Sequence, residues 1–541
     1  MEQPVLIYDT TLRDGTQREG VSLSADDKVK IARRLDEAGF HYVEGGYPLS
    51  NPKDIEFFSR MEESGLRRAK LVAFGSTRRP NVATPDANLS ALTSVKTPTV
   101  CIVGKSWTLH VDKVLGTTHD ENLNMIRDSV TYLRNVGREV IYDAEHFFDG
   151  FKDNPSYALA TLRAAGEAGA DWLVLCDTNG GVLPDEVIAI VRQVVDEFPQ
   201  YHIGIHTHND GELAVANTLA AVAAGARQVQ GTINGYGERT GNANLCSIVP
   251  NLQLKMGYHC VDDDQLRSLT DLSHYVAEVC NLAHDSHLPF VGISSFAHKA
   301  GLHVNAVTKN PQCYEHIRPE LVGNRQRILV SELSGRSNIL VKARQFGVDL
   351  AGKSADVRHV LETLKQLESE GFEFEAAEAS FELLMRRLQP EYRSPFELLD
   401  LLVLVERRRG ALIVAEATVK IKVGDAILHT AAEGNGPVNA VDAATRKALL
   451  QFYPEVARVQ LVDYKVRVLD GNDGTGAVVR VSIESSDGRT SWGTVGSSPN
   501  IIEASWLALA DSLEYALLKP LRANPEAAPI GDLGVSRQIL R

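Results

Sequence analysis

The chain has 541 residues, enough for roughly two to four domains, and its 44% hydrophobic and 23% charged residues are typical of a soluble globular protein. A net charge of −14 argues against electrostatic binding to nucleic acid, and no stretch approaches the roughly 20 apolar residues of a membrane helix. The N-terminus lacks the basic and apolar segments of a signal peptide, and the six cysteines are scattered without a CxxC pair. We therefore expect a cytoplasmic protein with reduced thiols, no nucleic-acid partner and no membrane segment.

From Val5 to about Leu245 the sequence repeats a unit of strand, polar strand end and amphipathic helix about every thirty residues. The eight candidate strands are VLIYDTTLRDG, HYVEGGYP, AKLVAFGST, TVCIVGKS, EVIYDAEHF, DWLVLCDTNGG, YHIGIHTHND and QVQGTINGYGERTGN. Eight such alternations predict an α/β fold, a (β/α)8 TIM barrel, over residues 1–260. An open doubly wound sheet is the alternative, but no GxGxxG follows the first strand.

Polar residues and glycines gather at the C-terminal ends of these strands, which is the end of a barrel that carries the active site. On the seventh strand His206 and His208 are two residues apart and therefore point to the same side. The seventh, eighth and first strands of a closed barrel are neighbours, so Asp14 and Asn242 lie at the same edge. A carboxylate, two imidazoles and a carboxamide there predict a site for a divalent metal. A polar strand end that only faces solvent is the alternative.

Two further regions follow the predicted barrel. Residues 261–395 are mainly helical, and we expect helical linker subdomains there, with the loop-rich segment SSFAHKAGLHVNAVTKNPQCYEHIRPELVGN. Residues 396–520 contain an internal repeat with the copies ATVKIKVGDAILHTAAEGNGPVNAVDAATRKALLQF and VVRVSIESSDGRTSWGTVGSSPNIIEASWLALADSL. Each copy reads as strand, turn, strand, a loop ending in Pro437 or Pro499, and helix, which predicts an α+β module. Residues 521–541 are expected to form an irregular tail.

The motifs DTTLRDGTQREG, HTHND and GERTGNANL stand in this order on the first, seventh and eighth predicted strands. With all three in place, the chain resembles the acyl-CoA-dependent Claisen-condensing barrels. These are the isopropylmalate, homocitrate and citramalate synthases, with the hydroxymethylglutaryl-CoA lyases as relatives. The resemblance covers essentially the whole chain, and YDAEHFFDGF and SFAHKAGLHVNAV are most similar to the citramalate synthase branch. It implies an acyltransferase that condenses acetyl-CoA with pyruvate and water to citramalate and CoA, in isoleucine biosynthesis.

The same resemblance implies a ligand set for the metal. A divalent cation is expected to chelate the keto acid and polarise its carbonyl. The four implied ligands are Asp14, His206, His208 and Asn242. Their mixed oxygen and nitrogen atoms suit Mg²⁺ or Mn²⁺, which we expect, and also Zn²⁺ or Co²⁺. Arg13 is implied to support the keto oxygen as it becomes an alkoxide, and a surface arginine in a salt bridge is the alternative.

Two residues at the ends of other strands also receive roles from the resemblance. Thr178, after the sixth strand, matches the position that holds the keto-acid carboxylate, and its alternative is to cap the following helix. Glu145, at the end of the fifth strand, matches a catalytic glutamate that helps in deprotonation or in activating water for thioester hydrolysis. Its alternative is a structural carboxylate that holds Arg13.

The segments beyond the barrel strands supply the remaining expected residues. His303, in AGLHVNAV, matches a histidine that helps to remove the methyl proton of the acetyl thioester, although Asn305 replaces the usual Asp. Tyr314, in PQCYEHI, matches a tyrosine that reaches the active site, and for both residues a structural role is the alternative. Backbone that approaches acyl-CoA closely is expected at Asn234, Gly235, Gly237 and Gly241.

Several functions remain open from the sequence. The C-terminal repeat resembles the allosteric domain of isopropylmalate and citramalate synthases, which implies a homodimer and an amino-acid effector, isoleucine. An isopropylmalate synthase acting on 2-oxoisovalerate is the nearest alternative, because only the size of an apolar pocket separates the two. Lyases of the hydroxymethylglutaryl type carry a cysteine in the loop after the eighth strand, and NGYGERTGNANL has none. A non-catalytic amino-acid sensor is the alternative from a different class, although every expected ligand is present.

Overall fold

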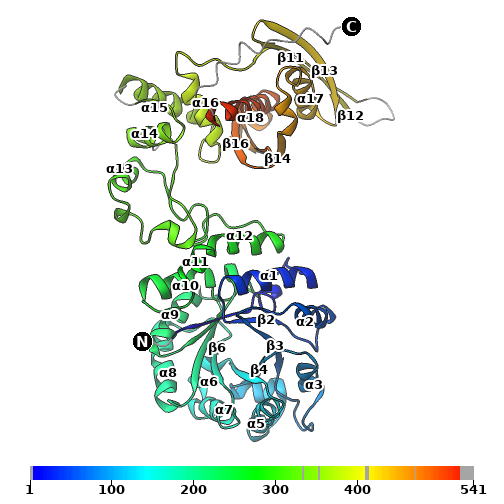
Figure 1. Cartoon of the computed structure of the whole chain (residues 1–541), viewed down its shortest axis with the longest axis vertical. Coiled ribbons are helices and arrows are strands. Elements are labelled where there is room, and N and C mark those ends of the chain that lie inside the picture. The colour runs from blue at the N-terminus through cyan, green and yellow to red at the C-terminus, as the bar shows by residue number, and fades with distance from the viewer. Residues whose placement is uncertain (1–3, 332–333, 351–353, 408–412, 470, 524–541) are drawn as a thin grey trace. The chain divides into compact units, whose positions relative to one another are not determined.

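Eight parallel strands close into a barrel in the computed structural model, and their order follows the chain (Figure 1). The strands are β1 (Leu6–Asp9), β2 (Tyr42–Gly46), β3 (Lys70–Ser76), β4 (Thr99–Lys105), β5 (Glu139–Glu145), β6 (Trp172–Asp177), β7 (His202–Thr207) and β8 (Gln228–Gly231). β8 pairs with β1 as well as with β7, which closes the sheet. The predicted (β/α)8 barrel is therefore confirmed, and the open doubly wound alternative is wrong.

The structure describes residues 4–331, 334–350, 354–407, 413–469 and 471–523. The chain divides into two units, which are described separately below. The first unit comprises Met1–Phe296 and Glu315–Gln326, and the second comprises Ala297–Tyr314 and Arg327–Arg541. Part of the predicted tail, residues 524–541, lies outside the described residues, while residues 521–523 belong to the last helix.

The helices of the first unit follow the strands as amphipathic segments. The first of them shows why they start where they do: the Ser24 hydroxyl accepts a hydrogen bond from the Asp27 backbone N–H, and the Asp27 carboxylate accepts one from the Ser24 backbone N–H. The helices of this unit are α1 (Ala25–Glu37), α2 (Pro52–Ser64), α3 (Ala87–Ser94), α4 (Thr108–His110), α5 (His119–Asn135), α6 (Phe147–Asp153), α7 (Pro155–Glu167), α8 (Pro184–Glu197), α9 (Ala214–Ala224), α10 (Leu245–Pro250), α11 (Asp263–Arg267) and α12 (Leu269–Val279).

The barrel interior is filled by side chains from alternate strand positions, and is a core rather than a pore. Its buried apolar members are Tyr8, Tyr42, Val72, Cys101, Ile141, Trp172, Val174 and Cys176. Residues two or four positions further along the same strands therefore face inward near the C-terminal end of the barrel. That geometry places the polar strand ends together.

The second unit begins with short strands and helices. β9 (Ala297–His298) and β10 (Arg327–Ile328) form a parallel pair. The helices that follow are α13 (Gly301–Lys309), α14 (Arg336–Gln345), α15 (Ser354–Ser369) and α16 (Glu378–Arg387). α16 packs against the last helix and the last strand of the repeated region. Among the described helices, none combines the length and apolar character of a membrane span.

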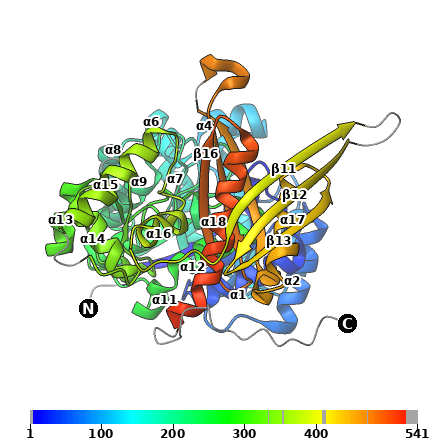
Figure 2. The ribbon, with the colours of Figure 1, turned by 90° about the horizontal axis from the view of Figure 1, so that it is seen from above.

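The internal repeat forms two three-stranded antiparallel sheets, each covered by one helix. The first copy is β11 (Glu397–Arg407), β12 (Ile413–Val423), β13 (Ala426–Gly434) and α17 (Pro437–Leu449). The second copy is β14 (Gln460–Val468), β15 (Val479–Ser486), β16 (Ser491–Ser498) and α18 (Ile501–Ala523). Figure 2 shows α17 beside the β11–β13 sheet and α18 beside β16. The structure adds one strand, β11 or β14, at the start of each predicted copy.

Candidate active site

Asp14, His206 and His208 form a buried cluster at the C-terminal end of the barrel. The Nε2 atom of His206 lies 3.1 Å from that of His208 and 3.6 Å from Asp14 Oδ2. His208 Nε2 lies 3.9 Å from the same oxygen, and the potential ligand atoms all fall within 4.8 Å of one another. One divalent cation requires such a convergence of oxygen and nitrogen atoms. The solvent-facing alternative for the histidine pair is wrong, because both rings are buried.

Two buried oxygen atoms at this cluster test whether a metal ion fits. Asp14 Oδ1 and Asn242 Oδ1 have no hydrogen-bond partner among the described residues. Asn242 is buried and its backbone pairs with that of His208, so it belongs to the same edge of the barrel. A buried acceptor without a partner is costly, and a cation would supply the missing contact. The donor set therefore fits a divalent ion.

The charges around the cluster prepare it for a cation. Burial opposes ionisation of Asp14, but Arg13 and the two histidines outweigh it and lower the pKa of its carboxyl. Burial, and then the neighbouring His206, lower the pKa of His208. Near pH 7 the cluster thus presents an ionised carboxylate and, at His208, a neutral imidazole, which are the protonation states that bind metals.

Arg13 lies next to the cluster and is held on three sides. Its Nε atom donates to Glu44 Oε2 at 2.6 Å, and its Nη1 atom lies 3.4 Å from Asp14 Oδ2. The guanidinium carbon sits 3.8 Å from the centre of the Phe74 ring. With a side chain only 14% exposed, Arg13 is not a surface arginine, and that alternative is wrong.

Glu44, at the C-terminal end of β2, is the carboxylate that orients Arg13. It is fully buried and also accepts hydrogen bonds from the Tyr8 hydroxyl, at 2.6 Å, and from the Thr10 hydroxyl. Glu145 pairs with a different residue, so the alternative in which Glu145 holds Arg13 is wrong. A buried, fully hydrogen-bonded carboxylate fixes the position of the guanidinium before any ligand arrives.

Glu145 pairs with Lys105 across β5 and β4. The two residues are register partners at the ends of their strands, and their side chains form an ion pair. Each side chain is about one-fifth exposed, at 23% and 22%. Because Lys105 is four positions after the inward-facing Cys101, the pair faces the barrel mouth. The predicted glutamate is therefore accompanied by an ammonium group.

Thr178 follows β6 at the same end of the barrel. Its hydroxyl accepts a hydrogen bond from the backbone N–H of His146 at 2.9 Å. The next helix, α8, has Leu183 at its N-cap position, so the helix-capping alternative for Thr178 is wrong. Arg239 donates to the Thr178 carbonyl oxygen at 2.7 Å and to the Asp210 carboxylate at 2.7 and 2.9 Å. The loops after β6, β7 and β8 are thereby joined around the mouth.

The glycine-rich loop after β8 has an unusual backbone. Asn234, Gly235, Gly237 and Gly241 all have positive φ. At Gly241 a Cβ atom would lie only 1.9 Å from the carbonyl oxygen of Gly235, so no side chain fits there. The side chain of Asn234 donates to the Ser273 carbonyl oxygen at 2.9 Å and accepts from the Ser273 hydroxyl at 2.5 Å. This residue therefore ties the loop to α12.

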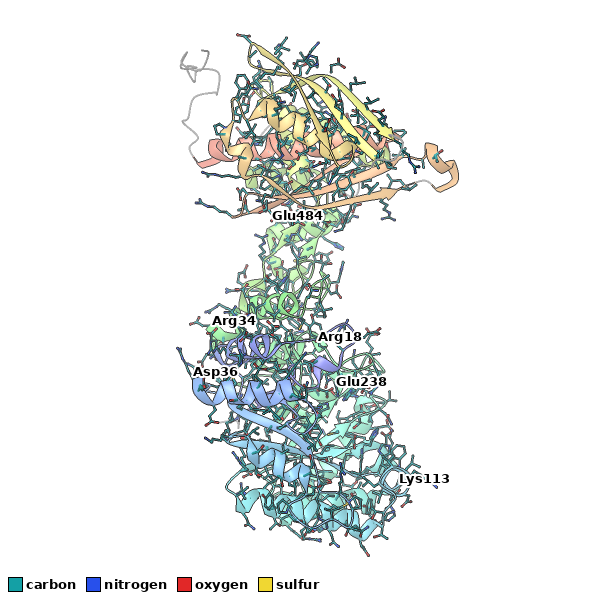
Figure 3. The ribbon with its side chains drawn as sticks, turned by 90° about the vertical axis from the view of Figure 1, so that its right-hand side faces the viewer. Arg18, Arg34, Asp36, Lys113, Glu238 and Glu484 are labelled. Carbon is teal, nitrogen blue, oxygen red and sulfur yellow. The ribbon has the colours of Figure 1, made fainter. Side chains whose placement is uncertain are left out.

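A cavity of about 420 Å³ opens beside this loop. Its lining includes Arg18, Glu212, Asn234, Gly235, Asn242 and His284. In Figure 3, Arg18 and Glu238 mark the loops after β1 and β8. Asn242 lines the cavity and pairs through its backbone with His208 of the metal cluster. A small molecule bound in this cavity would have direct access to Asn242, one of the predicted metal ligands.

His303 and Tyr314 form a ring pair in the second unit. Their ring centroids are 4.2 Å apart with an interplanar angle of 31°, and both side chains are exposed. His303 lies on α13, and Tyr314 follows a short turn after that helix. The structure thus brings together the two residues that sequence analysis expects from the linker.

Known protein families and proteins match this chain over most of its length. Three family models match successive segments: HMGL-like over residues 4–273, homocitrate synthase post-HMGL domain-like over 290–371, and LeuA allosteric (dimerisation) domain over 375–517. The chain is 54% identical to an (R)-citramalate synthase of Aquifex aeolicus, over 96% of this chain and 99% of that protein. It is also 54% identical to an (R)-citramalate synthase of Geobacter sulfurreducens, over 95% and 98%. The chain belongs to the (R)-citramalate synthase family.

A 2-isopropylmalate synthase is a more distant relative of this (R)-citramalate synthase family member. A 2-isopropylmalate synthase of Sulfolobus acidocaldarius is 34% identical over 69% of this chain and 94% of that protein. Enzymes of the HMGL-like family are metal-dependent, and Asp14, His206 and His208 form a candidate site for the ion.

Three residues that contact the site residues were not identified from the sequence. They are Glu44 beside Arg13, Lys105 beside Glu145, and Gln230 beside His206. Each is a polar residue at or near the C-terminal end of a barrel strand, in phase with inward-facing positions. Such residues can be found from the sequence as polar residues at strand positions that face inward. A polar side chain that faces an apolar barrel interior needs a hydrogen-bond or ion-pair partner.

Proposed function

We propose that the protein condenses acetyl-CoA with pyruvate and hydrolyses the thioester, which yields (R)-citramalate and free CoA and serves isoleucine biosynthesis. The observation that carries the proposal is the buried Asp14–His206–His208 cluster with Arg13 beside it, in a chain whose full-length relatives are named (R)-citramalate synthases. In this reaction a carbon–carbon bond forms between the acetyl methyl carbon and the keto carbon, and water then breaks the carbon–sulfur bond.

The residues around the metal cluster suit the keto-acid half of the reaction. A divalent cation held by Asp14, His206, His208 and Asn242, for which we propose Mg²⁺ or Mn²⁺, would polarise the keto carbonyl. Arg13, fixed by Glu44, donates to the keto oxygen as it gains negative charge. The Thr178 hydroxyl binds the keto-acid carboxylate. Loss of thiol release on replacing each residue tests these roles.

The acetyl-CoA half of the reaction is assigned to other groups. The loop of Asn234, Gly235, Gly237 and Gly241, with the adjoining cavity, receives the acyl-CoA. His303, with Tyr314 or Glu145, takes the methyl proton so that the carbanion attacks the keto carbon. The Lys105 side chain lies beside Glu145 as its ion-pair partner and orients that carboxylate at the mouth of the barrel.

Release of free CoA thiol from acetyl-CoA tests the proposal directly. With pyruvate, 2-oxobutyrate, 2-oxoisovalerate and 2-oxoglutarate as acceptors, we expect pyruvate to give the highest kcat/KM, at least about tenfold above 2-oxoisovalerate, since extra methyl groups in a closed pocket cost roughly 1–3 kcal/mol. A chelator should stop release, and Mg²⁺ or Mn²⁺ should restore it. A preference for 2-oxoisovalerate would overturn the substrate assignment, and release that ignores the chelator would overturn the metal-assisted mechanism.

The repeated module is proposed to form a homodimer and to bind an amino-acid effector, isoleucine. The match of residues 375–517 to an allosteric dimerisation domain supports dimer formation and effector binding, while isoleucine is what the resemblance to citramalate synthases implies. Isoleucine is expected to lower thiol release by the full-length protein, while leucine at the same concentration leaves it unchanged. A folded fragment of residues 1–395 that is still inhibited by isoleucine would place the effector site outside the module.

A further inference from the structure

A row of buried hydrogen bonds lies behind His206, on the side away from Asp14. His206 Nδ1 lies 2.8 Å from Gln230 Oε1, and Gln230 Nε2 lies 3.0 Å from Asp143 Oδ1. The three residues come from β7, β8 and β5, and each has at most 4% of its surface exposed. His206 and Gln230 are register partners on neighbouring strands, while Asp143 reaches across the barrel interior. Such buried groups lie in a medium of low dielectric constant, where a mismatched donor or acceptor is costly, so the polarity of each bond matters.

The polarity of this row follows from the donors and acceptors. An ionised Asp143 can only accept hydrogen bonds, so the NH₂ group of Gln230 must face it. The Gln230 carbonyl oxygen then faces His206 and can only accept, which places the ring proton on Nδ1. The second hydrogen of the Gln230 amide points toward Gln228 Oε1 at 3.5 Å. In the neutral ring this arrangement puts the free lone pair on Nε2, the atom that lies 3.6 Å from Asp14 Oδ2.

The opposite amide orientation would disable the cluster. A reversed Gln230 would donate to His206 Nδ1 and move the ring proton to Nε2, where a cation has to bind. It would also turn the Gln230 carbonyl oxygen toward the Asp143 carboxylate, two acceptors 3.0 Å apart. Asp143 therefore selects the amide orientation, and the amide selects the tautomer. Burial raises the pKa of Asp143 to about 6, so the carboxyl is still ionised near pH 7.

We propose that Asp143 and Gln230 are positioning residues that hold His206 in the one tautomer whose Nε2 atom binds the divalent cation. The inference deepens the proposed function, since it rests on the metal site of that function. Partners behind a metal-binding histidine raise its basicity and fix its ring, and losing one weakens metal affinity by about 10- to 100-fold. Neither residue is expected to touch substrate.

The test compares two variants that differ in the acceptor they offer to His206. Gln230→Met keeps the side-chain length but removes the acceptor, so the affinity for Mn²⁺ should fall by about 10- to 100-fold. The double variant Asp143→Asn, Gln230→Glu moves the buried carboxylate to position 230. There it accepts both from the new amide at position 143 and from His206 Nδ1, so Mn²⁺ affinity should stay close to that of the unmodified protein. Calorimetric titration of the metal-free full-length protein with Mn²⁺ measures each value.

Asn217→Leu is the matched control. Asn217 is also a fully buried amide, donating to the Val182 carbonyl oxygen at 2.7 Å, but it lies on α9 away from the cluster. It should lower the melting temperature without changing Mn²⁺ affinity. If Gln230→Met fails to fold, the double variant tests the proposal alone. If Asp143 and Gln230 were merely structural, moving the buried carboxylate to position 230 should weaken Mn²⁺ binding.

Two results would overturn the proposal: a folded Gln230→Met protein that binds Mn²⁺ as tightly as the unmodified protein, or a folded double variant with strongly reduced affinity. Because the titration contains no acetyl-CoA and no keto acid, it is independent of whether condensation occurs. An unmodified protein that binds no Mn²⁺ would overturn the metal site and this inference together, whereas failure of thiol release alone would leave the affinity comparison valid.

Discussion

Replacing a metal ligand is expected to have the largest effect on this protein. His206→Ala or Asp14→Ala should lower thiol release from acetyl-CoA and pyruvate by about a thousandfold or more, because a Lewis acid contributes several kcal/mol of charge stabilisation and each 1.4 kcal/mol is tenfold in rate. Both variants should also lose Mn²⁺ on dialysis, since each removes one of the four proposed ligands. Thiol release and retained metal are measured on the same samples.

His202→Ala is the matched control for His206→Ala. His202 starts the same strand, β7, but is exposed and packs at a tilt against Trp172, with ring centroids 5.0 Å apart. It lies at the opposite end of the barrel, which carries stability rather than chemistry. The control should therefore keep both metal and activity. A metal-free His206→Ala protein with unmodified activity would remove the histidine pair from the mechanism.

The second large effect is expected at Arg13. Arg13→Lys keeps the charge, but a lysine cannot contact Glu44, Asp14 and the Phe74 face at once as the planar guanidinium does. Losing one donor to a developing oxyanion costs about 10²- to 10³-fold in kcat. We therefore expect kcat for thiol release to fall by that factor, while Mn²⁺ stays bound, because Arg13 donates hydrogen bonds and is not a ligand.

Arg163→Lys provides the comparison for Arg13→Lys. Arg163 also pairs with a carboxylate, Glu197 at 2.8 Å, and lies 5.2 Å from the centre of the Phe198 ring. It is half exposed on α7, outside the barrel interior. Steady-state rates of the two variants separate the loss of guanidinium geometry at the site from the loss of an arginine in general. Equal kcat values in both would contradict the role assigned to Arg13.

Much of the fold is determined by local patterns. The alternation of strands and helices predicted all eight barrel strands, because apolar periodicity and polar strand ends are properties of short segments. The repeat was visible for the same reason, but its first strands, β11 and β14, were missed because the aligned copies began one strand later. A first strand that differs between copies escapes an alignment based on self-similarity.

The site shows where local reasoning stops. Asp14, His206, His208 and Asn242 could be grouped before any coordinates, since closing a barrel makes the first, seventh and eighth strands neighbours. The partner of Arg13 could not be chosen in the same way, because Glu44 and Glu145 both lie in the C-terminal parts of barrel strands. Only the packed interior shows that Glu44 forms an ion pair with Arg13 and that Lys105 forms one with Glu145.

The sequence by itself thus determined the barrel, the repeated module and the family, and it grouped the proposed metal ligands, because each is written in periodicity or in short motifs. The tertiary structure alone decided which buried polar groups pair: Glu44 with Arg13, Lys105 with Glu145, and Asp143 through Gln230 with His206. Each pairing joins residues of different strands or of the loops that follow them, and the one between Asp143 and Gln230 reaches from β5 to β8. They depend on side-chain reach and direction inside a closed barrel, and no pattern along one strand specifies them.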